Sequence, residues 1–452
     1  MEKKEHYGLA TAISMIVGIT IGSGIFFKVD DILIETGGNI WLGALVFIVG
    51  ALCVIFGSIT LSQLASRVKN NQGVISYYEV FISEKAANAF GWFQLFVYYP
   101  TIAAVVSWVA GIYTLSLLGV HSSLGLEILL AFFYISFFFM LNYFSYKLGG
   151  RFQNITTIAK MIPLIAVAVI SLFWTSHLGG VENQTNLINH SPIGLSWLGA
   201  LAPIAFSFDG WIVSTNITQE VKNHKKNMPI ALALGPVIVL AVYLAFYFGM
   251  IIIVGKGYIL AAGDQAIIQV GHLIFGQIGE KILLIFILLA VLGVVNGLSL
   301  GYIRLPQILA SKKMIPNSKK IKKINPDKGL SPHSATLAYL ITVFWLFIHY
   351  FSQKFALLNG GDVSEIAIVF SYLAYTLLYL KVIKLKKIGE IKSFFLGVVS
   401  PILGILGSLV ILTGGLFSNP LYGPVFFIFS TLISFLGYYY NFHINKKSPK
   451  ES

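Results

Sequence analysis

The chain has 452 residues, of which 56% are hydrophobic and only 11% are charged, with 31 Lys and Arg against 18 Asp and Glu. A soluble domain typically carries about 25% charged residues, whereas the mean hydropathy of this chain is +0.81. The net charge of +13 does not indicate a nucleic-acid partner, because no soluble domain is available to carry a basic surface. The composition predicts an all-α polytopic membrane protein.

The single cysteine, Cys53, lies in an apolar segment, so no intrachain disulfide and no cysteine metal site are expected. The histidines show no metal-ligand pairing, and we expect neither a metal nor a cofactor. The first apolar stretch runs from Leu9 through Phe27 without a small-residue cleavage context. We therefore interpret it as a retained membrane span rather than a signal peptide.

Apolar runs, and the charged or Gly/Pro positions between them, predict twelve membrane spans in one transporter domain covering residues 1–452. The spans lie near 9–36, 40–65, 86–118, 124–144, 152–174, 195–221, 229–254, 280–304, 334–351, 364–380, 393–416 and 421–441. With a cytoplasmic N-terminus, Lys and Arg fall mostly on the inner side; the exceptions are Lys28, Lys256, Lys281 and Lys354 outside and Lys160 within a span. The positive-inside rule therefore predicts that both termini, including a tail at 442–452, are cytoplasmic.

The first span contains three glycines and two hydroxyl residues between Gly18 and Phe26, in the middle of an otherwise apolar helix. Glycine is about 1 kcal/mol less favourable than alanine in a helix interior. Gly18 and Gly22 also match the small-xxx-small spacing of tight helix packing, which is the alternative explanation. That spacing does not require Gly24 beside Ser23, so the run favours a real interruption of the helix.

The sixth span carries Asp209 and Gly210 about midway along its length, after Phe206 and Ser207. An ionisable group at that depth is expensive and should face a cavity or a partner. A protonated Asp209, hydrogen-bonded to a neighbouring helix, is the alternative.

These two interruptions occupy matching places in two halves of opposite topology, residues 9–174 and 195–380, with two extra helices at 393–441. This arrangement is typical of inverted-repeat transporters, whose site lies near the membrane midplane. Free amides at the start of one half-helix can hold a carboxylate, and free carbonyls at the end of another can hold an ammonium. A zwitterion needs both, so the pattern points to α-amino acids as substrates.

Four segments resemble the amino acid–polyamine–organocation superfamily, and most closely its L-type amino acid transporter branch. They are GSGIF in the first span, QGVISYYEVF after the second, FSFDGW with TQEVKNHKKNMP in and behind the sixth, and GYIRLPQILASKKMIP closing the eighth. The resemblance covers nearly all spans in order. It implies a five-plus-five inverted repeat with discontinuous first and sixth helices, alternating access, and Na⁺-independent amino acid transport, often by exchange.

The resemblance also implies roles for individual residues. Ser23 and Gly24 would receive the substrate carboxylate, the carbonyls of Thr20, Phe206 and Asp209 would face the amine, and Phe206 would close over the substrate as a gate. Asp209 departs from the uncharged residue that many relatives carry before the GW pair. The residues expected to bind substrate are Thr20, Gly22, Ser23, Gly24, Ile25, Phe206, Ser207 and Asp209.

Lys160 follows Arg151 by nine residues, which places it about 13 Å into the membrane. Gly18 to Thr20 and Asn296 lie at similar depth from their own cytoplasmic ends, so the broken first helix could offer its carbonyls as a partner. We expect Lys160 and Asn296 to act in coupling or in the conformational change. The resemblance implies that the Lys160 cation substitutes for a bound Na⁺ between the first, fifth and eighth spans. A purely structural role for Lys160 is the alternative.

Animal members of this branch pair with a glycoprotein through a cysteine between the third and fourth spans. The corresponding loop here, residues 119–123, has no cysteine, so we expect no disulfide-linked heavy chain. The sequence is interpreted as a bacterial exchanger of neutral L-amino acids in the plasma membrane, not an enzyme. Proton-coupled uptake is the alternative among transporters, and a channel or a membrane-embedded enzyme is the alternative from a different class.

Overall fold

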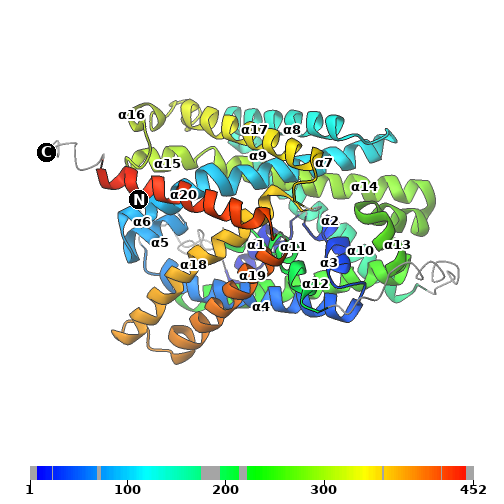
Figure 1. Ribbon diagram of the computed structural model, residues 1–452, viewed down its shortest axis with the longest axis horizontal. Helices are drawn as coiled ribbons and strands as arrows, with labels where there is room; N and C mark the ends of the chain where they lie inside the picture. Colours follow the sequence, from blue (N-terminus) through cyan, green and yellow to red (C-terminus); the bar gives the residue numbers. More distant parts are fainter. Residues whose placement is uncertain are drawn as a thin grey trace. The chain divides into compact units, whose positions relative to one another are not determined.

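The structure is a computed structural model that describes residues 8–22, 24–68, 73–174, 194–212, 221–358, 361–418 and 420–443. Within these ranges the regular structure is helical (Figure 1), and the only pairing of strand type is an isolated antiparallel bridge between Asn325 and Leu330. The predicted all-α fold class is confirmed.

Ten segments of the described chain are long and apolar enough to cross a membrane. They are α4 (Ile40–Ala65), α6 to α7 (Glu84–Leu118), α8 (Leu124–Phe144), the part Lys147–Leu172 of α9 and α10, the part Lys226–Val254 of α12, α14 to α15 (Ala266–Ser311), α17 (Pro332–Lys354), α18 (Val363–Lys387), η6 to α19 (Phe395–Ser418) and the part Tyr422–Tyr440 of α20. Two shorter apolar segments, Leu9–Gly18 and Ser196–Ser207, lie in the first and sixth predicted spans. These segments account for all twelve predicted spans.

Several span boundaries differ from the prediction. The tenth span was expected to end at residue 380, but α18 continues to Lys387. Lysine is a good helix former, and its stem can reach the membrane surface, so the charged run extends the helix instead of ending it. The eighth span was expected from residue 280; α14 (Ala266–Tyr302) begins at Ala266 but is non-helical at Phe275 and Gly276, so the helix that forms this span resumes after Gly276, close to the expected start.

The described chain forms two compact units, each of which combines separate parts of the sequence. One unit comprises Met1–Gly73, Thr157–Ala290 and Tyr375–Pro420; the other comprises Val74–Thr156, Val291–Ala374 and Leu421–Ser452. Each unit therefore draws on both predicted repeats, and the division does not follow 9–174 and 195–380. The inverted repeat stays a prediction.

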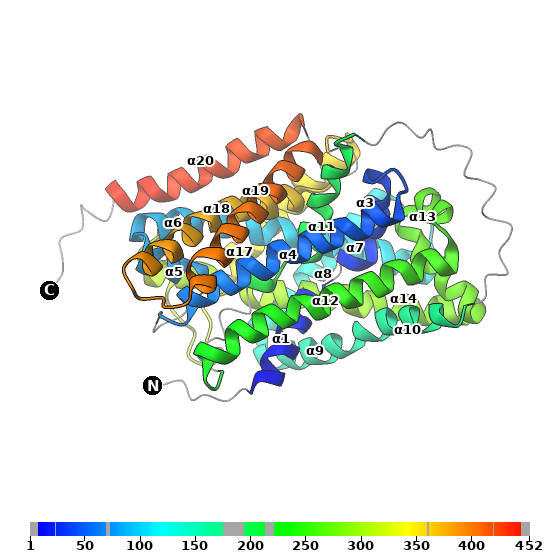
Figure 2. The same cartoon turned by 90° about the horizontal axis from the view of Figure 1, so that it is seen from below.

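In the first unit, α12 packs along α1, α4 and α10 (Figure 2). Glycines on one face of α4 permit close approach: an added Cβ at Gly57 would lie 2.5 Å from the Tyr379 hydroxyl oxygen, and one at Gly50 would lie 3.0 Å from Ile204. Small residues are the usual means of tight helix packing in membranes, where the lipid is as apolar as the side chains.

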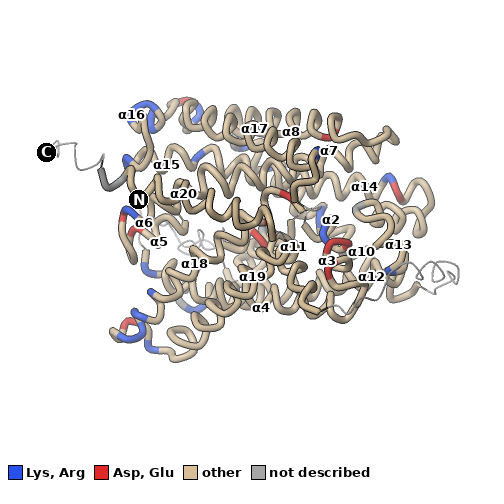
Figure 3. Tube along the Cα trace, in the orientation of Figure 1, with Lys and Arg blue, Asp and Glu red and all other residues tan. Residues whose placement is uncertain are grey.

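In the second unit, α6 (Glu84–Phe93) packs against α20 (Tyr422–His443), and α7 (Tyr99–Leu118), α8 and α17 pack together. Asn88 Nδ2 donates a hydrogen bond of 2.7 Å to the carbonyl of Gly437, which holds α6 to α20. Figure 3 shows that Lys and Arg gather at helix ends and connections, α16 (Ser318–Ile321) among them, and leave long uncharged stretches between. This is the charge distribution expected of membrane-spanning helices.

Candidate functional site

The first interruption lies between α1 (Leu9–Thr20) and α2 (Gly24–Phe27). Ile21 takes an extended conformation, with φ −67° and ψ 97°, and Gly22 is non-helical. Ser23 lies outside the described residues. The last carbonyls of α1 are therefore released from the helix ladder at the place where the glycine run predicts a break.

The second interruption follows a 3₁₀ segment, η3 (Ser196–Ala200), and the short helix α11 (Leu201–Ser207). Phe208 to Gly210 form a turn in which the amide of Asp209 donates to the carbonyl of Phe206 at 3.0 Å. Gly210 has φ +94°, a conformation that L side chains rarely adopt. The continuation at 213–220 lies outside the described residues.

The structure brings the two interruptions into direct contact. A Cβ added to Gly24 would lie 2.8 Å from Ser207 Cα and 2.9 Å from Phe206 Cδ1, so the backbones of α2 and α11 touch. The hydroxyl of Tyr243, on α12 (His224–Val254), lies 2.8 Å from the carbonyl oxygen of Ser207 and 3.3 Å from that of Thr20. Tyr243 is fully buried and thus links the ends of α1 and α11. No local sequence signal marked Tyr243.

One buried polar side chain at this junction lacks a hydrogen-bond partner among the described residues. The side-chain oxygen Oγ1 of Thr20 is buried and has no hydrogen-bond partner among the described residues. Buried polar groups in proteins are almost always hydrogen-bonded, so an orphan requires an explanation. A polar ligand at the interruption would supply the partner.

The ring of Phe206 lies close to the ammonium of Lys28, a residue that the sequence predicts to lie outside the membrane. The ammonium of Lys28 lies 5.6 Å from the ring centroid of Phe206 and 5.4 Å from that of Phe27. The two rings meet edge to face at 5.4 Å, and Lys28 Nζ is 3.1 Å from a carboxylate oxygen of Asp31 on α3 (Val29–Glu35). Lys28 is only 4% exposed. A desolvated cation over an aromatic face is stabilising by about 2 kcal/mol.

Lys160 lies between α9 (Tyr146–Ala159) and α10 (Met161–Leu172) and is 4% exposed. Its ammonium donates a hydrogen bond to the carbonyl of Gly18, within the carbonyl end of α1 that was expected to be its partner. A charge-assisted hydrogen bond is about twice as strong as a neutral one. The buried ammonium of Lys160 therefore has a hydrogen-bond acceptor at the carbonyl end of the interrupted helix α1.

Asn296, on α14, is fully buried in the second unit. Its Nδ2 donates to the carbonyl of Gly149 at 2.9 Å and to Gln153 Oε1 at 3.1 Å, and its Oδ1 accepts from Asn142 at 3.0 Å. These bonds hold α14 to the start of α9. A part for Asn296 in coupling or in the conformational change stays a prediction.

These features define a class: polytopic helical membrane proteins whose first and sixth spans are interrupted and meet at a polar junction. The chain belongs to the family of amino acid permeases, which matches residues 7–443. Within the amino acid–polyamine–organocation superfamily it is similar to the L-type transporters, as its sequence motifs predict.

The relatives include bacterial and animal proteins. The chain is 26% identical over 420 residues to the serine/threonine exchanger SteT of Bacillus subtilis, covering 92% of each chain. It is 24% identical over 458 residues to the b(0,+)-type amino acid transporter 1 of Mus musculus, covering 97% of this chain and 89% of the relative. It is 26% identical over 291 residues to the large neutral amino acids transporter small subunit 2 of Homo sapiens, covering 62% of this chain and 51% of the relative.

Proposed function

We propose that the protein exchanges neutral L-amino acids across the plasma membrane, without Na⁺, by alternating access. The observation that carries the proposal is the direct contact of two interrupted helices, beside the buried Thr20 Oγ1, which has no hydrogen-bond partner in the part of the chain that the structure describes. The family and the names of the relatives, which are transporters and exchangers of amino acids, support it.

The substrate is bound by its zwitterionic part. The amides of Gly24 and Ile25 at the start of α2, with that of Ser23 just before them in the sequence, receive the carboxylate, and the carbonyl end of α1 together with the turn at Asp209 receives the ammonium. Since Gly24 contacts Phe206 and Ser207 in this conformation, the substrate enters only when α2 and α11 separate. That separation couples binding to the conformational change.

Phe206 is the lid over this site, and Lys28 positions it. The cation lies close to the faces of Phe206 and Phe27, and its ion pair with Asp31 ties the lid to α3. Movement of Phe206 breaks its contact with the Lys28 ammonium, so Lys28 favours the closed lid. The free energy of this cation–π contact is comparable to the free-energy difference that commonly separates two conformers of a protein.

Lys160 takes the place of a sodium ion. Its ammonium already occupies the carbonyl of Gly18, so the end of α1 is neutralised without a bound cation. Transport independent of external Na⁺ follows from this arrangement.

The orientation and the partners are part of the same proposal. Both termini are cytoplasmic, because the basic residues then lie on the inner side. The transporter works without a disulfide-linked heavy chain, since Cys53 is buried in α4 and the 119–123 loop has no cysteine.

Counterflow in proteoliposomes with a panel of the twenty amino acids tests the function. Exchange predicts that an unlabelled amino acid inside accelerates uptake of a labelled one, and that dissipating the proton gradient has no effect. Uptake that needs a proton gradient and shows no trans-stimulation would instead establish proton coupling. Unsaturable conductance in a planar bilayer would identify a channel.

A further inference from the structure

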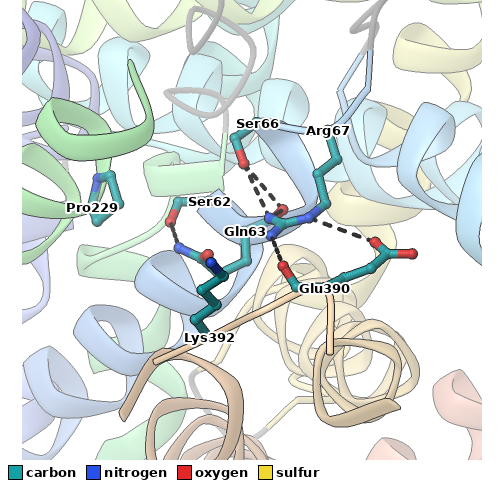
Figure 4. Close-up of a pocket in the computed structure, with 7 residues that line it drawn as sticks. All are labelled: Ser62, Gln63, Ser66, Arg67, Pro229, Glu390 and Lys392. Atoms are coloured by element: carbon teal, nitrogen blue, oxygen red, sulfur yellow. Dashed lines mark hydrogen bonds and ion pairs between the residues drawn. The ribbon is translucent and has the colours of Figure 1, made fainter. Parts of the chain in front are cut away.

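A polar hollow of about 570 Å³ lies in the first unit, away from the helix interruptions. It opens among the end of α4, the start of α12 and the turn between α18 and η6 (Figure 4). Ser62, Gln63 and Arg67 come from the α4 side, Pro229 from α12, and Glu390 and Lys392 from the turn. Three separate elements thus converge on one cavity.

The turn is built to present its charged side chains to this cavity. After α18 ends at Lys387, the amide of Gly389 bonds to the Lys386 carbonyl and the amide of Glu390 to that of Leu385. Gly389 has φ +85°, as expected of a glycine that closes a helix. The ammonium of Lys386 donates to the Lys392 carbonyl at 2.8 Å, which fixes the far end of the turn.

Arg67 is held in the cavity but keeps part of its guanidinium available. Its Nη1 donates to the carbonyl of Gln63 at 2.5 Å, and its Nη2 donates to the carbonyl of Glu390 at 3.1 Å (Figure 4). The carboxylate of Glu390 lies 3.9 Å from Nε, which is an ion-pair distance and too long for a hydrogen bond. The edge formed by Nε and Nη2 therefore retains donors for a planar or tetrahedral anion.

The charges of the lining favour an anion. Arg67 and Lys392 are opposed by Glu390 alone, and the Glu390 side chain is 52% exposed, so it can turn away without a buried charge being left behind. The Lys392 ammonium has no ion-pair or hydrogen-bond partner among the described residues. A guanidinium such as that of Arg67 and an ammonium such as that of Lys392 are groups that bind phosphate oxygens in proteins.

The position of the hollow identifies the source of the phosphate. The end of the second span, the start of the seventh and the turn between the tenth and eleventh all fall on the cytoplasmic side in the predicted orientation. Basic pockets between membrane helices on that side bind the headgroups of anionic lipids. We propose that this cavity binds the phosphate headgroup of an anionic phospholipid of the inner leaflet.

Binding by the full-length, delipidated protein in neutral detergent tests this proposal without any transport measurement. The probes are short-chain phosphatidylglycerol, phosphatidylcholine with the same acyl chains, and inorganic phosphate. Affinity is read from the rise in unfolding temperature with ligand concentration, because a ligand that binds only the folded state stabilises it by mass action. The outcome is independent of whether the protein exchanges amino acids.

Three substitutions are expected to weaken, to strengthen and to leave unchanged the binding of phosphatidylglycerol. Lys392→Gln should weaken phosphatidylglycerol binding about fivefold, the value of one surface charge near an anionic headgroup. Glu390→Gln should strengthen it, since the competing carboxylate is removed. Lys323→Gln, at an exposed lysine of the basic loop before α17, is the matched control and should leave binding unchanged.

Other results overturn the proposal. Equal binding of phosphatidylcholine, weakened by Glu390→Gln, would mean that the pocket recognises a zwitterion. Inorganic phosphate that binds as tightly as phosphatidylglycerol would assign the site to a soluble phosphate compound. Loss of binding in Lys323→Gln equal to that in Lys392→Gln would reduce the effect to general surface charge. Arg67 also hydrogen-bonds the turn, so Arg67→Gln could weaken binding by disturbing the fold. Lys392→Gln avoids this, because the Lys392 ammonium makes no hydrogen bond or ion pair among the described residues, and Arg67→Gln is therefore compared with it.

Discussion

Replacing Gly24 by alanine should act as a wedge between the two interrupted helices. The added methyl carbon would lie 2.8 Å from Ser207 Cα, 2.9 Å from Phe206 Cδ1 and 3.2 Å from Ser207 Oγ. Carbon atoms prefer separations of about 3.5 to 4.0 Å, so α2 and α11 must move apart by roughly 1 Å. The nearest obstacle is backbone, which a change of rotamer cannot remove.

Overpacking of this kind costs about 1 to 3 kcal/mol. A bias of that size changes the ratio of two conformers by roughly 5- to 150-fold. Conformations in which α2 touches α11 should therefore become minor states in Gly24→Ala, and exchange should slow by at least about fivefold. Gly24→Leu, with a larger side chain at the same place, should abolish exchange.

The assay is counterflow in proteoliposomes at matched protein density, with the unfolding temperature measured in parallel to show that the variant folds. Gly125→Ala is the matched control, because Gly125 is also helical, in α8, and an added Cβ there meets nothing within 4 Å. Wild-type rate and affinity in Gly24→Ala would refute the reasoning, since the contact between α2 and α11 would then have no part in the cycle.

Three further outcomes are expected. Lys160→Ala should insert into the membrane but lose most of its exchange activity, because the Gly18 carbonyl loses its cation. Full activity would mean that Lys160 only packs. Lys281→Ala, at an exposed lysine of α14, is the control. Replacing external Na⁺ by choline should leave exchange intact, and a strict Na⁺ requirement would contradict the role given to Lys160. Phe206→Ala should raise the apparent KM or uncouple exchange, and Lys28→Met should shift the same parameter in the same direction by a smaller factor. Unchanged KM and stoichiometry in both variants would return Phe206 to ordinary core packing.

The sequence alone determined the class of the protein and the places where its helices break. Uncharged runs of about 20 residues have one stable form in a bilayer, because every backbone group must be satisfied internally. The glycine run from Gly18 to Gly24 and the Asp209-Gly210 pair make a continuous membrane helix unfavourable at those positions. Because this free-energy cost depends on the local sequence alone, the helix breaks can be predicted without tertiary information. The depth of Lys160, counted along its own helix, was enough to indicate the carbonyl end of α1 as its partner.

The tertiary structure decided which distant groups complete the junction. Tyr243 reaches Thr20 and Ser207 from a different helix, and nothing in its own segment distinguishes it from other aromatic residues. Lys28 reads as one more external charge until the fold buries it beside Phe206. Helix ends were equally out of reach, since α18 continues through charged residues that hydropathy treats as a boundary. Periodicity and composition describe one helix at a time, whereas these contacts depend on the angle and register at which separate helices pack.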